Sequence, residues 1–449
     1  MNGSSNARPA QYLAIGFATT VAMWAIGYFA MMRPGTVAGE AIFGLMIVAA
    51  LLGGFVAGKF APTASKAQCA IRGAKAGVMS ASANLLIVGS LFGSGTEASV
   101  WKALATWVGG LVLSSIVIMG IGGAIGAGGA RWTPRLSAAA TFARTTCVAI
   151  FLLLVTGGLV TGLEAGLAVP DWPNSFGHNM LLYPLAEMKG GVYYEHAHRL
   201  YGMLVGVSAV TLAVLVLRSK CTRIVRMLAI VGLVMVAAQG VMGGLRVTGH
   251  LTMAQDAEAM KPSLALAVVH GVFGQIVFAV YCWLAVLLGP RWTSDAIAPV
   301  TGSARASTMS RVLVVVLLMQ LVSGALYRHL QVPQPNAAPT HPAWAMHLHV
   351  TWALVVFVTA LFVGLRAMRV SGSSAPLRAV GHGLLMLVGL QVAFGIGSLV
   401  MVILRKGAPI PTLEVVFTSL HQSTGALLLG TSAVLAAWWW RVSAASAKA

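Results

Sequence analysis

Long apolar segments alternate with short polar ones along the whole chain. A membrane-spanning helix needs about 20 mostly apolar residues, and twelve segments meet that requirement. They lie at residues 12–31, 41–58, 79–95, 103–128, 146–165, 197–217, 227–247, 263–288, 312–328, 343–365, 379–403 and 415–440. The pattern predicts an all-α integral membrane protein with about 12 transmembrane helices.

The composition agrees with that pattern. Of the 449 residues, 58% are hydrophobic and only 9% are charged, whereas about a quarter of the residues of a soluble domain carry charge. This balance excludes an ordinary soluble domain, and it excludes a disordered chain, which is poor in apolar residues. The glycine-rich stretch Gly120–Gly129 has the small-residue spacing of close helix packing in lipid, so we interpret it as packing rather than as a phosphate loop.

The charges carry an orientation signal. The chain has 29 Lys and Arg against 10 Asp and Glu, a net charge of +19. With twelve spans, twenty of the basic residues fall at the termini and in the even-numbered loops, which places both termini in the cytoplasm by the positive-inside rule. The basic excess therefore indicates topology, and we expect the lipid bilayer, and no nucleic acid, as partner. The chain shows neither a secretory signal peptide nor a mitochondrial leader, which favours the bacterial cytoplasmic membrane.

Histidines reveal an internal repeat. His198 and His270 are 72 residues apart, and so are His349 and His421; a shift of 151 residues carries the first pair onto the second. A Gln-x-x-x-Gly pattern recurs beside them at Gln239, Gln320 and Gln391. We therefore expect the last eight helices to form two pseudo-symmetric four-helix bundles. The predicted domains are an N-terminal four-helix module of unknown role (1–140), a first four-helix unit (141–290) and a second one (291–449).

Ionisable residues inside membrane spans are costly and usually functional. Histidine is a haem axial ligand, and a four-helix bundle can hold a cofactor between facing helices. The four repeated histidines therefore predict haem sites near the outer face, although a helix–helix hydrogen bond is the plainer interpretation of any single one. Zinc or copper is less favoured because no Cys or Met cluster accompanies them. Three arginines at outer helix ends could bind haem propionates, or could simply reach the membrane surface: Arg199, Arg246 and Arg328.

The remaining histidines receive plainer interpretations. His196 and His347 lie two residues from proposed ligands and so point elsewhere on a helix. His382 lies near an inner helix end and is interpreted as structural. We expect four others to be solvated in outer loops: His178, His250, His329 and His341.

Three segments resemble a known family. Glu195-His196-Ala197-His198-Arg199 resembles the E-x-x-H-R motif of the haem A synthase family of bacteria and mitochondria. The outer-loop sequence from Thr161 to Pro173 and the sequence His421-Gln422-Ser423-Thr424-Gly425-Ala426 resemble that family's first outer loop and last helix. The resemblance covers about residues 146–441. Some bacterial members have a cysteine pair in the first outer loop, and this chain has none there, so no disulfide role carries over.

The resemblance implies oxidation of the C8 methyl of haem O to the formyl group of haem A, by two oxygen-dependent hydroxylations and loss of water, for cytochrome oxidase biogenesis. It implies that His198 and His270 ligate the substrate haem, and that His349 and His421 ligate a resident haem b. Glu195 would be the catalytic carboxylate, although a first-turn charge that complements the helix dipole is the plainer interpretation. The implied partners are haem O, the farnesyltransferase that makes it, an electron donor and cytochrome oxidase assembly factors.

Two other functions stay open at this point. A di-haem b-type electron-transfer cytochrome would use the same four histidines without a substrate haem. A transporter with 12 helices would also fit the span count, but the spans contain almost no carboxylates, and the repeat falls in the last eight spans rather than dividing the chain at its middle. Residues 1–140 have no counterpart in the family resemblance.

Overall fold

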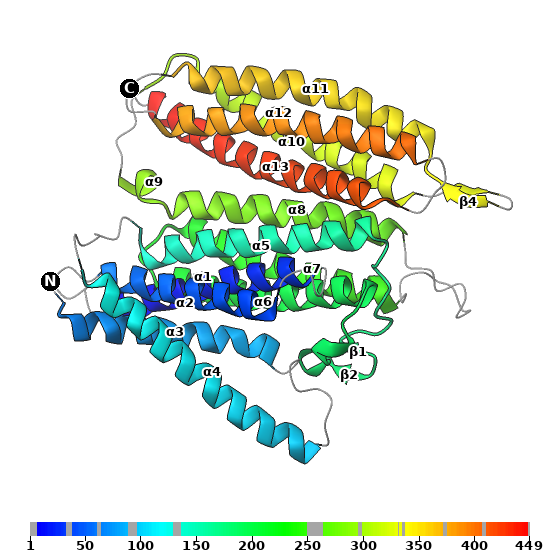
Figure 1. Ribbon diagram of the computed structural model, residues 1–449. Helices are drawn as coiled ribbons and strands as arrows, with labels where there is room; N and C mark the ends of the chain where they lie inside the picture. The colour runs from blue at the N-terminus through cyan, green and yellow to red at the C-terminus, as the bar shows by residue number, and fades with distance from the viewer. Residues whose placement is uncertain are drawn as a thin grey trace. The chain divides into compact units, whose positions relative to one another are not determined.

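The structure is a computed structural model that describes residues 7–32, 38–60, 64–88, 97–128, 136–248, 264–294, 299–330, 332–334, 337–370, 375–405 and 410–447. Within these ranges the chain is almost entirely helical (Figure 1). His250, which was predicted to be a solvated loop residue, lies outside them.

Each of the twelve predicted spans overlaps one long α-helix in the described part of the chain. The helices are α1 (Ala7–Met31), α2 (Gly39–Lys59), α3 (Lys66–Val88), α4 (Glu97–Gly126), α5 (Ala138–Gly162), α6 (Gly191–Leu217), α7 (Arg223–Thr248), α8 (Leu264–Leu287), α10 (Ser303–His329), α11 (Ala343–Met368), α12 (Ala375–Leu404) and α13 (Thr412–Ser446), with the short α9 (Pro290–Ser294) between α8 and α10. Ten of them are long and apolar enough to cross a membrane, α3 and α13 being the two that are not counted. The prediction of an all-α, multi-pass membrane protein is confirmed.

The predicted position of the third helix was wrong at its start. We expected a span from residue 79, whereas α3 begins at Lys66. Its first half combines small residues with Lys66, Arg72 and Lys75, so its hydropathy is low although its helix propensity is adequate. The Arg72 guanidinium donates to the carbonyl of Phe60 at 3.1 Å, which lets a basic side chain lie along the helix end rather than in a loop.

The chain divides into two compact units. The first comprises Met1–Thr156, Ala165–Leu233 and Leu288–Pro290, and the second comprises Gly157–Glu164, Val234–Leu287 and Arg291–Ala449. The predicted division at residues 140 and 290 rests on the sequence repeat and remains a prediction. Each unit is described below by itself.

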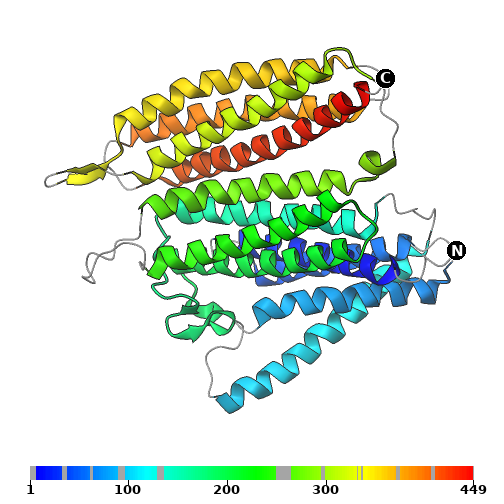
Figure 2. The same cartoon turned by 180° about the vertical axis from the view of Figure 1, so that it is seen from behind.

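Glycines let three helices of the first unit approach closely. α2, α3 and α4 pack against one another, and α4 runs beside α3 before it splays away (Figures 1 and 2). A Cβ atom added at Gly54 of α2 or at Gly73 of α3 would collide with the backbone carbonyl of Met119 on α4. A Cβ atom added at Gly123 of α4 would likewise collide with the carbonyl of Cys69. The glycine-rich stretch of α4 is therefore a packing surface, as the small-residue spacing predicted.

An aromatic joint connects α1 to α6 within the same unit. Tyr28 of α1 stacks on Tyr193 of α6, with ring centroids 5.6 Å apart, and meets Tyr201 edge-on at 5.7 Å. The Tyr193 hydroxyl donates to the carbonyl of Tyr28 at 2.6 Å, and the Tyr194 hydroxyl donates to the carbonyl of Met32 at 3.3 Å. The last carbonyls of a helix have no partner within the helix, so the two tyrosines of α6 cap the end of α1.

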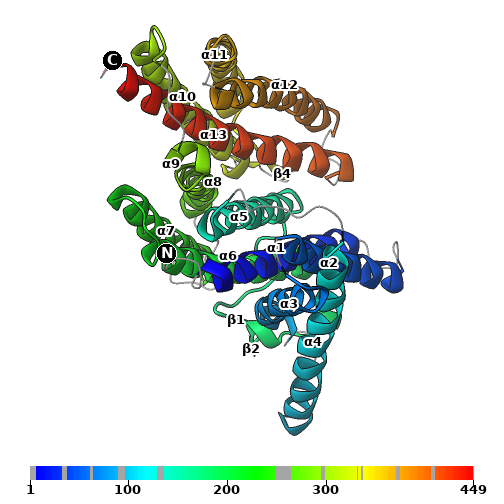
Figure 3. The same cartoon turned by 90° about the vertical axis from the view of Figure 1, so that its left-hand side faces the viewer.

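The second unit is built around α8 and α10–α13. The last four of these lie together in Figure 3, with α13 in contact with α8, α10 and α12. Its core contains Leu313 of α10, Ala360 of α11, Leu384 of α12 and Trp439 of α13, none of which is exposed to solvent. These buried side chains come from each of α10 to α13 and fix which face of each of these helices points inward.

Two outer connections carry small hairpins. Between α5 and α6, β1 (Asn174–Ser175) pairs antiparallel with β2 (His178–Asn179), and two single-turn 3-10 helices follow, η2 (Met180–Leu182) and η3 (Leu185–Glu187). Between α10 and α11, β3 (Val332–Gln334) pairs antiparallel with β4 (Ala337–Thr340). The two connections occupy the same place in the predicted repeat.

Candidate functional site

The four repeated histidines lie at similar positions along their helices. His198 of α6 is seven residues from the start of its helix, His270 of α8 and His349 of α11 are six, and His421 of α13 is nine. At 1.5 Å of rise per residue, these positions are about 9–14 Å from the helix starts. The sequence repeat therefore corresponds to similar positions along the four helices.

His349 and His421 are neighbours in the second unit. Their ring centroids are 6.1 Å apart, and the ring planes are inclined at 79°. Each ring is also contacted by the glutamine of the helix before it. Gln320 of α10 donates to the carbonyl of His349 at 3.0 Å, and the Gln391 carboxamide nitrogen of α12 lies 3.3 Å from Nε2 of His421. Nδ1 of His349 lies 3.1 Å from the Ser323 hydroxyl and 3.2 Å from the Gln320 carboxamide nitrogen. Nδ1 of His421 lies 3.1 Å from the backbone carbonyl of Gln391.

A glycine lies against the Cε1 edge of each of these rings. A Cβ atom added at Gly324 would lie 2.8 Å from Cε1 of His349, and one added at Gly395 would lie 2.9 Å from Cε1 of His421. Cβ atoms essentially never approach so closely, so a larger residue at either place would force the ring to shift. We call this arrangement a histidine cradle: a glutamine, a glycine four residues later, and the histidine that the next helix places against them.

The same cradle holds His270. Gln239 of α7 donates to the carbonyl of His270 at 2.7 Å, and a Cβ atom added at Gly243 would lie 3.2 Å from its Cε1. Among the described residues, Nδ1 of His270 is buried without a hydrogen-bond partner. Arg246, in the last turn of α7, interacts electrostatically with His270. A buried, unsatisfied imidazole nitrogen is rare in a folded protein and calls for an explanation.

His198 belongs to the first unit and has a different support. The buried Thr156 hydroxyl of α5 lies 2.9 Å from Nδ1 of His198 and donates to the carbonyl of Leu153 at 2.8 Å. Because His198 and His270 belong to different compact units, their pairing stays a prediction.

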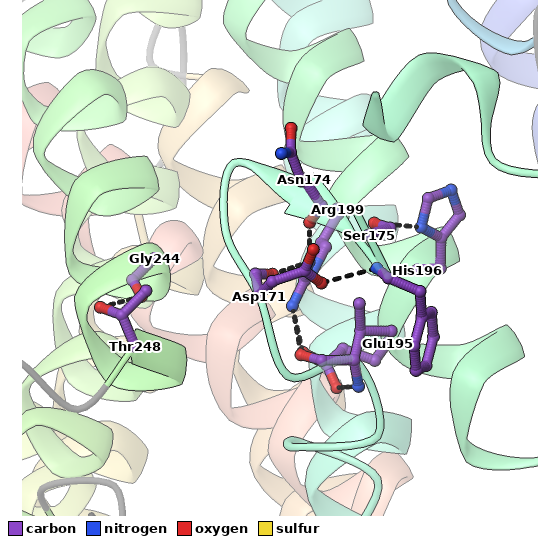
Figure 4. A network of polar contacts seen from close by, with 10 residues as sticks. Asp171, Asn174, Ser175, Glu195, His196, Arg199, Gly244 and Thr248 are labelled. Carbon is purple, nitrogen blue, oxygen red and sulfur yellow. Dashed lines mark hydrogen bonds and ion pairs between the residues drawn. The ribbon is translucent and has the colours of Figure 1, made fainter. Parts of the chain in front are cut away.

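An ion pair holds the long outer loop against α6. Glu195 and Arg199 stand one turn apart, with Nη2 of Arg199 2.8 Å from Oε1 of Glu195, and their side chains are only 5% and 8% exposed. The other carboxylate oxygen of Glu195 accepts the backbone N–H of Val169 at 2.9 Å. Arg199 also donates to three loop carbonyls (Figure 4), those of Val169, Asp171 and Asn174. Four of its five N–H donors therefore point to the loop or to Glu195, and only Nε–H remains for any other anion.

Asp171 organises the tip of this loop. Its carboxylate accepts the backbone N–H groups of Phe176 at 2.7 Å and Gly177 at 2.8 Å, in the turn that joins β1 to β2. Both turn residues have positive φ, 51° and 77°, as a tight hairpin turn requires. Partial burial opposes the charge of Asp171, but the N–H groups of Gly177 and Phe176, with the charge of Arg199, outweigh it and lower the pKa of the carboxyl group.

His196 is part of the loop attachment. It is fully buried, its Nδ1 lies 3.1 Å from the Ser175 hydroxyl, and its ring lies 5.0 Å from that of Tyr183 (Figure 4 shows His196 beside Ser175). It thus faces the loop. His347, its counterpart in the repeat, is exposed.

The histidines outside the repeat differ partly from expectation. His178 is exposed in β2, as predicted. His329 and His341 were expected to be solvated loop residues, and both are half-buried instead. His329 is the last residue of α10, because the helix continues beyond the apolar segment, and Nδ1 of His341 lies 3.2 Å from the carbonyl of Leu330. The inner-end histidine, His382, lies 3.0 Å from the carbonyl of Arg378 one turn earlier.

The third candidate arginine also contacts backbone. Arg328 of α10 donates to the carbonyl of Thr161 in the second unit. A further basic residue that the sequence analysis did not single out, Arg405, lies 3.5 Å from the buried carboxylate of Glu414 at the start of α13. Thr156 and Ser323 were also missed. Their signal is positional, since each directly precedes a glycine in the helix before a repeated histidine.

The fold and the cradles define a polytopic helical membrane protein in which two helices, α11 and α13, bring the histidines His349 and His421 together. The family model of the cytochrome oxidase assembly proteins COX15-CtaA matches residues 140–433. The chain belongs to this family, the haem A synthase family, and the predicted resemblance is confirmed. The protein is therefore a multi-pass membrane protein of a family that acts in haem A biosynthesis and cytochrome oxidase assembly.

A curated relative shows a more local similarity. The protoheme IX farnesyltransferase of Haloarcula marismortui is 31% identical over 134 residues, which are 30% of this chain and 26% of the relative. The chain thus spans about a quarter of the length of that relative.

Proposed function

We propose that the protein is a haem A synthase, an oxidoreductase that converts the C8 methyl group of haem O to the formyl group of haem A. The observation that carries this proposal is the pair of cradled histidines His349 and His421 in a chain of this family. The local similarity to a protoheme IX farnesyltransferase supports a haem as the substrate of the protein.

The residues present fit a haem ligated by two imidazoles. The ring centroids of His349 and His421 are 6.1 Å apart, close enough for both imidazoles to hold one haem iron. In both rings Nδ1 has a hydroxyl or backbone carbonyl partner, and a glutamine carboxamide nitrogen lies 3.3 Å from Nε2. Nε2 would bind iron in this proposal, and the carboxamides of Gln320 and Gln391 would have to turn away from it. In this proposal His349 and His421 hold haem b, and His198 and His270 hold the substrate haem. Bound haem b would supply electron transfer to the oxidation.

Glu195 is the proposed catalytic carboxylate. Arg199 and the Val169 N–H hold its carboxylate in place, and Glu195 lies one turn before His198 on α6. An ionised carboxylate there can accept a proton released from the substrate or stabilise a developing positive charge. Because the ion pair also attaches the outer loop to α6, the loop would exclude water from the surroundings of the Glu195 carboxylate.

The propionate groups of a haem need cationic partners. Arg246 and Arg328 stand at the outer ends of α7 and α10 and are the proposed partners, together with the remaining Nε–H of Arg199. We place the protein in the bacterial cytoplasmic membrane, with both termini in the cytoplasm and the haem sites toward the outer face. Its partners would be the farnesyltransferase that makes haem O, an electron donor and cytochrome oxidase assembly factors.

Chromatography of extracted haems, combined with the visible spectrum of the purified protein, tests this function. Wild type supplied with haem O should contain haem b and produce haem A. His349→Ala should lose haem b, and His198→Ala should lose the substrate haem but keep haem b. Glu195→Gln should bind both haems and stop the conversion. Haem b alone, with no conversion of supplied haem O, would instead indicate an electron-transfer cytochrome, and a protein without Soret absorption would indicate a transporter.

A further inference from the structure

Three tryptophans and an arginine pack together near the C-terminal end of α13, within the second unit. Trp292 of α9 lies nearly parallel to Trp440 of α13, with ring centroids 6.5 Å apart, and meets Trp438 edge-on at 5.1 Å. The guanidinium carbon of Arg441 lies 5.1 Å from the ring centroid of Trp292 and 5.5 Å from that of Trp438, close enough for cation–π attraction to both rings. We call Trp292, Trp438, Trp440 and Arg441 the tryptophan stack.

The tryptophan stack connects the buried core of the second unit to two exposed side chains. Trp438 belongs to the core and is 7% exposed, whereas Trp440 is 50% exposed. Nη1 of Arg441 donates to the backbone carbonyl of Arg291 at 2.8 Å, which ties α9 to α13. Arg291 itself is exposed, and its side chain makes no hydrogen bond or ion pair with the residues that the structure describes. A held backbone therefore presents a solvated guanidinium next to Trp292, on which the exposed indole stacks.

The tryptophan stack lies far along α13 from the repeated histidine of that helix. Positions 421 and 438 are 17 residues apart, which is about 25 Å at 1.5 Å of rise per residue. The hydrocarbon core of a bilayer is about 30 Å thick, and His421 lies near the start of α13. The stack therefore lies near the opposite membrane surface, at the level of the lipid headgroups, where tryptophan is enriched.

This end of the second unit is strongly basic. Six arginines lie within five residues of a helix end here: Arg291, Arg305, Arg366, Arg369, Arg378 and Arg441. The acidic residues of this unit whose placement the structure describes are Glu164, which follows α5, and Glu414, at the start of α13, and both belong to the other end. The positive charge of the six arginines is therefore not balanced by a described carboxylate. Such a surface beside a membrane attracts anionic lipid headgroups.

We propose that Arg291 and the tryptophan stack form a binding site for an anionic phospholipid. The Arg291 guanidinium holds the lipid phosphate, because its planar set of N–H donors matches phosphate oxygens. Trp440 packs against the glycerol backbone and the first carbons of the acyl chains. Arg441 acts indirectly, since its hydrogen bond fixes the backbone of Arg291 and its charge adds to the attraction. The site lies away from the cradles and goes beyond the proposed function.

Native mass spectrometry of the purified full-length protein in mixed micelles tests the site. Wild type should bind phosphatidylglycerol about tenfold more tightly than phosphatidylcholine with the same acyl chains, because only the first has a net negative headgroup. Arg291→Gln should weaken phosphatidylglycerol binding about tenfold, the effect of losing a hydrogen bond to a charged group. Arg311→Gln removes the same charge from the same unit. The Arg311 guanidinium contacts Ser307 and Thr308 within α10, so this control should bind like wild type.

Trp440→Leu tests the indole separately. It keeps every charge and an apolar side chain, so it should weaken binding of both lipids and leave the preference for phosphatidylglycerol unchanged. Arg291 is exposed, and Arg291→Gln should melt at the wild-type temperature. If Arg291→Gln does not fold, Trp440→Leu decides, because unchanged lipid binding in that variant contradicts the site.

Three results would overturn the proposal. Wild type could bind the two lipids equally, or Arg291→Gln could keep the wild-type affinity for phosphatidylglycerol. In a third arm, millimolar inorganic phosphate is added to the lipid-bound protein. Displacement of phosphatidylglycerol would show that the site recognises a free phosphate ion, whereas a lipid held by both its headgroup and its acyl chains should stay bound.

Discussion

Arg199 reaches across one turn of α6 to Glu195 at 2.8 Å, and both residues bind the same outer loop. The pair thereby links the proposed catalytic carboxylate to the position of the loop above it. A substitution of Glu195 or Arg199 should therefore alter the carboxylate and the loop position together.

Removal of Arg199 should therefore destabilise the loop attachment strongly. Arg199→Met leaves the buried Glu195 carboxylate without its cation, and breaking a buried ion pair from one side costs about 3–5 kcal/mol. We expect a lower melting temperature and faster hydrogen exchange of the loop between α5 and α6. Arg311→Met, at an exposed position of α10, is the control. Unchanged exchange in Arg199→Met would show that the loop does not depend on this pair.

The turn at Phe176 and Gly177 should loosen at low pH. The pKa of Asp171 in the folded protein is lowered below its ordinary value of about 3.9. The stability that the ionised Asp171 carboxylate contributes is therefore complete above its ordinary pKa. It is lost as the pH falls through the lower pKa of the folded protein. Pepsin cleavage at the exposed Phe176 measures the change. The rate for Asp171→Asn divided by the wild-type rate should exceed one near pH 4 and approach one as the pH falls; a ratio independent of pH would contradict this.

A methyl group in a cradle should expel its histidine. Gly324→Ala and Gly395→Ala would place a Cβ atom 2.8 and 2.9 Å from the facing ring, whereas Gly243→Ala would place it at 3.2 Å. We expect large losses of bound haem in the first two variants and a smaller loss in the third, measured as haem per protein. Gly389→Ala on α12 meets nothing within 4 Å and should keep its haem. Equal haem content in all four variants would argue against the cradle.

The tyrosine cap on α1 should contribute to the stability of the first unit. Tyr193→Phe keeps the ring that stacks on Tyr28 and removes the hydroxyl that donates to its carbonyl. The expected cost is about 1 kcal/mol, or up to about 3 kcal/mol if the carbonyl stays buried without a partner. Thermal unfolding in detergent measures it, with Tyr12→Phe on α1 as the control. If the two variants melt at the same temperature, the Tyr193 hydroxyl does not stabilise the first unit.

Helix number and helix type could be predicted because apolar segments of span length are a strong signal. The start of α3 could not, since Lys66, Arg72 and Lys75 lower the hydropathy of a segment whose small residues still form a helix. The end of α10 was missed by one residue, because His329 is polar and yet helical.

The histidine repeat predicted the residues of the candidate site, but not what holds them. Thr156 and Ser323 are unremarkable hydroxyl residues in sequence, and their contacts with His198 and His349 depend on how neighbouring helices are rotated. The attachment of Glu195 to Val169 likewise joins residues 26 positions apart through a loop of irregular backbone. Periodicity describes one helix at a time, whereas these contacts need two elements in register.

The contact between Tyr193 and the carbonyl of Tyr28 joins positions 165 residues apart in the chain. During synthesis the N-terminal part of a protein is made and folds first, so α1 to α4 enter the membrane well before α6 exists. Until then, the final carbonyls of α1 depend on water or lipid headgroups. The joint between α1 and α6 therefore closes late in assembly, and a chain interrupted before α6 would leave the end of α1 uncapped.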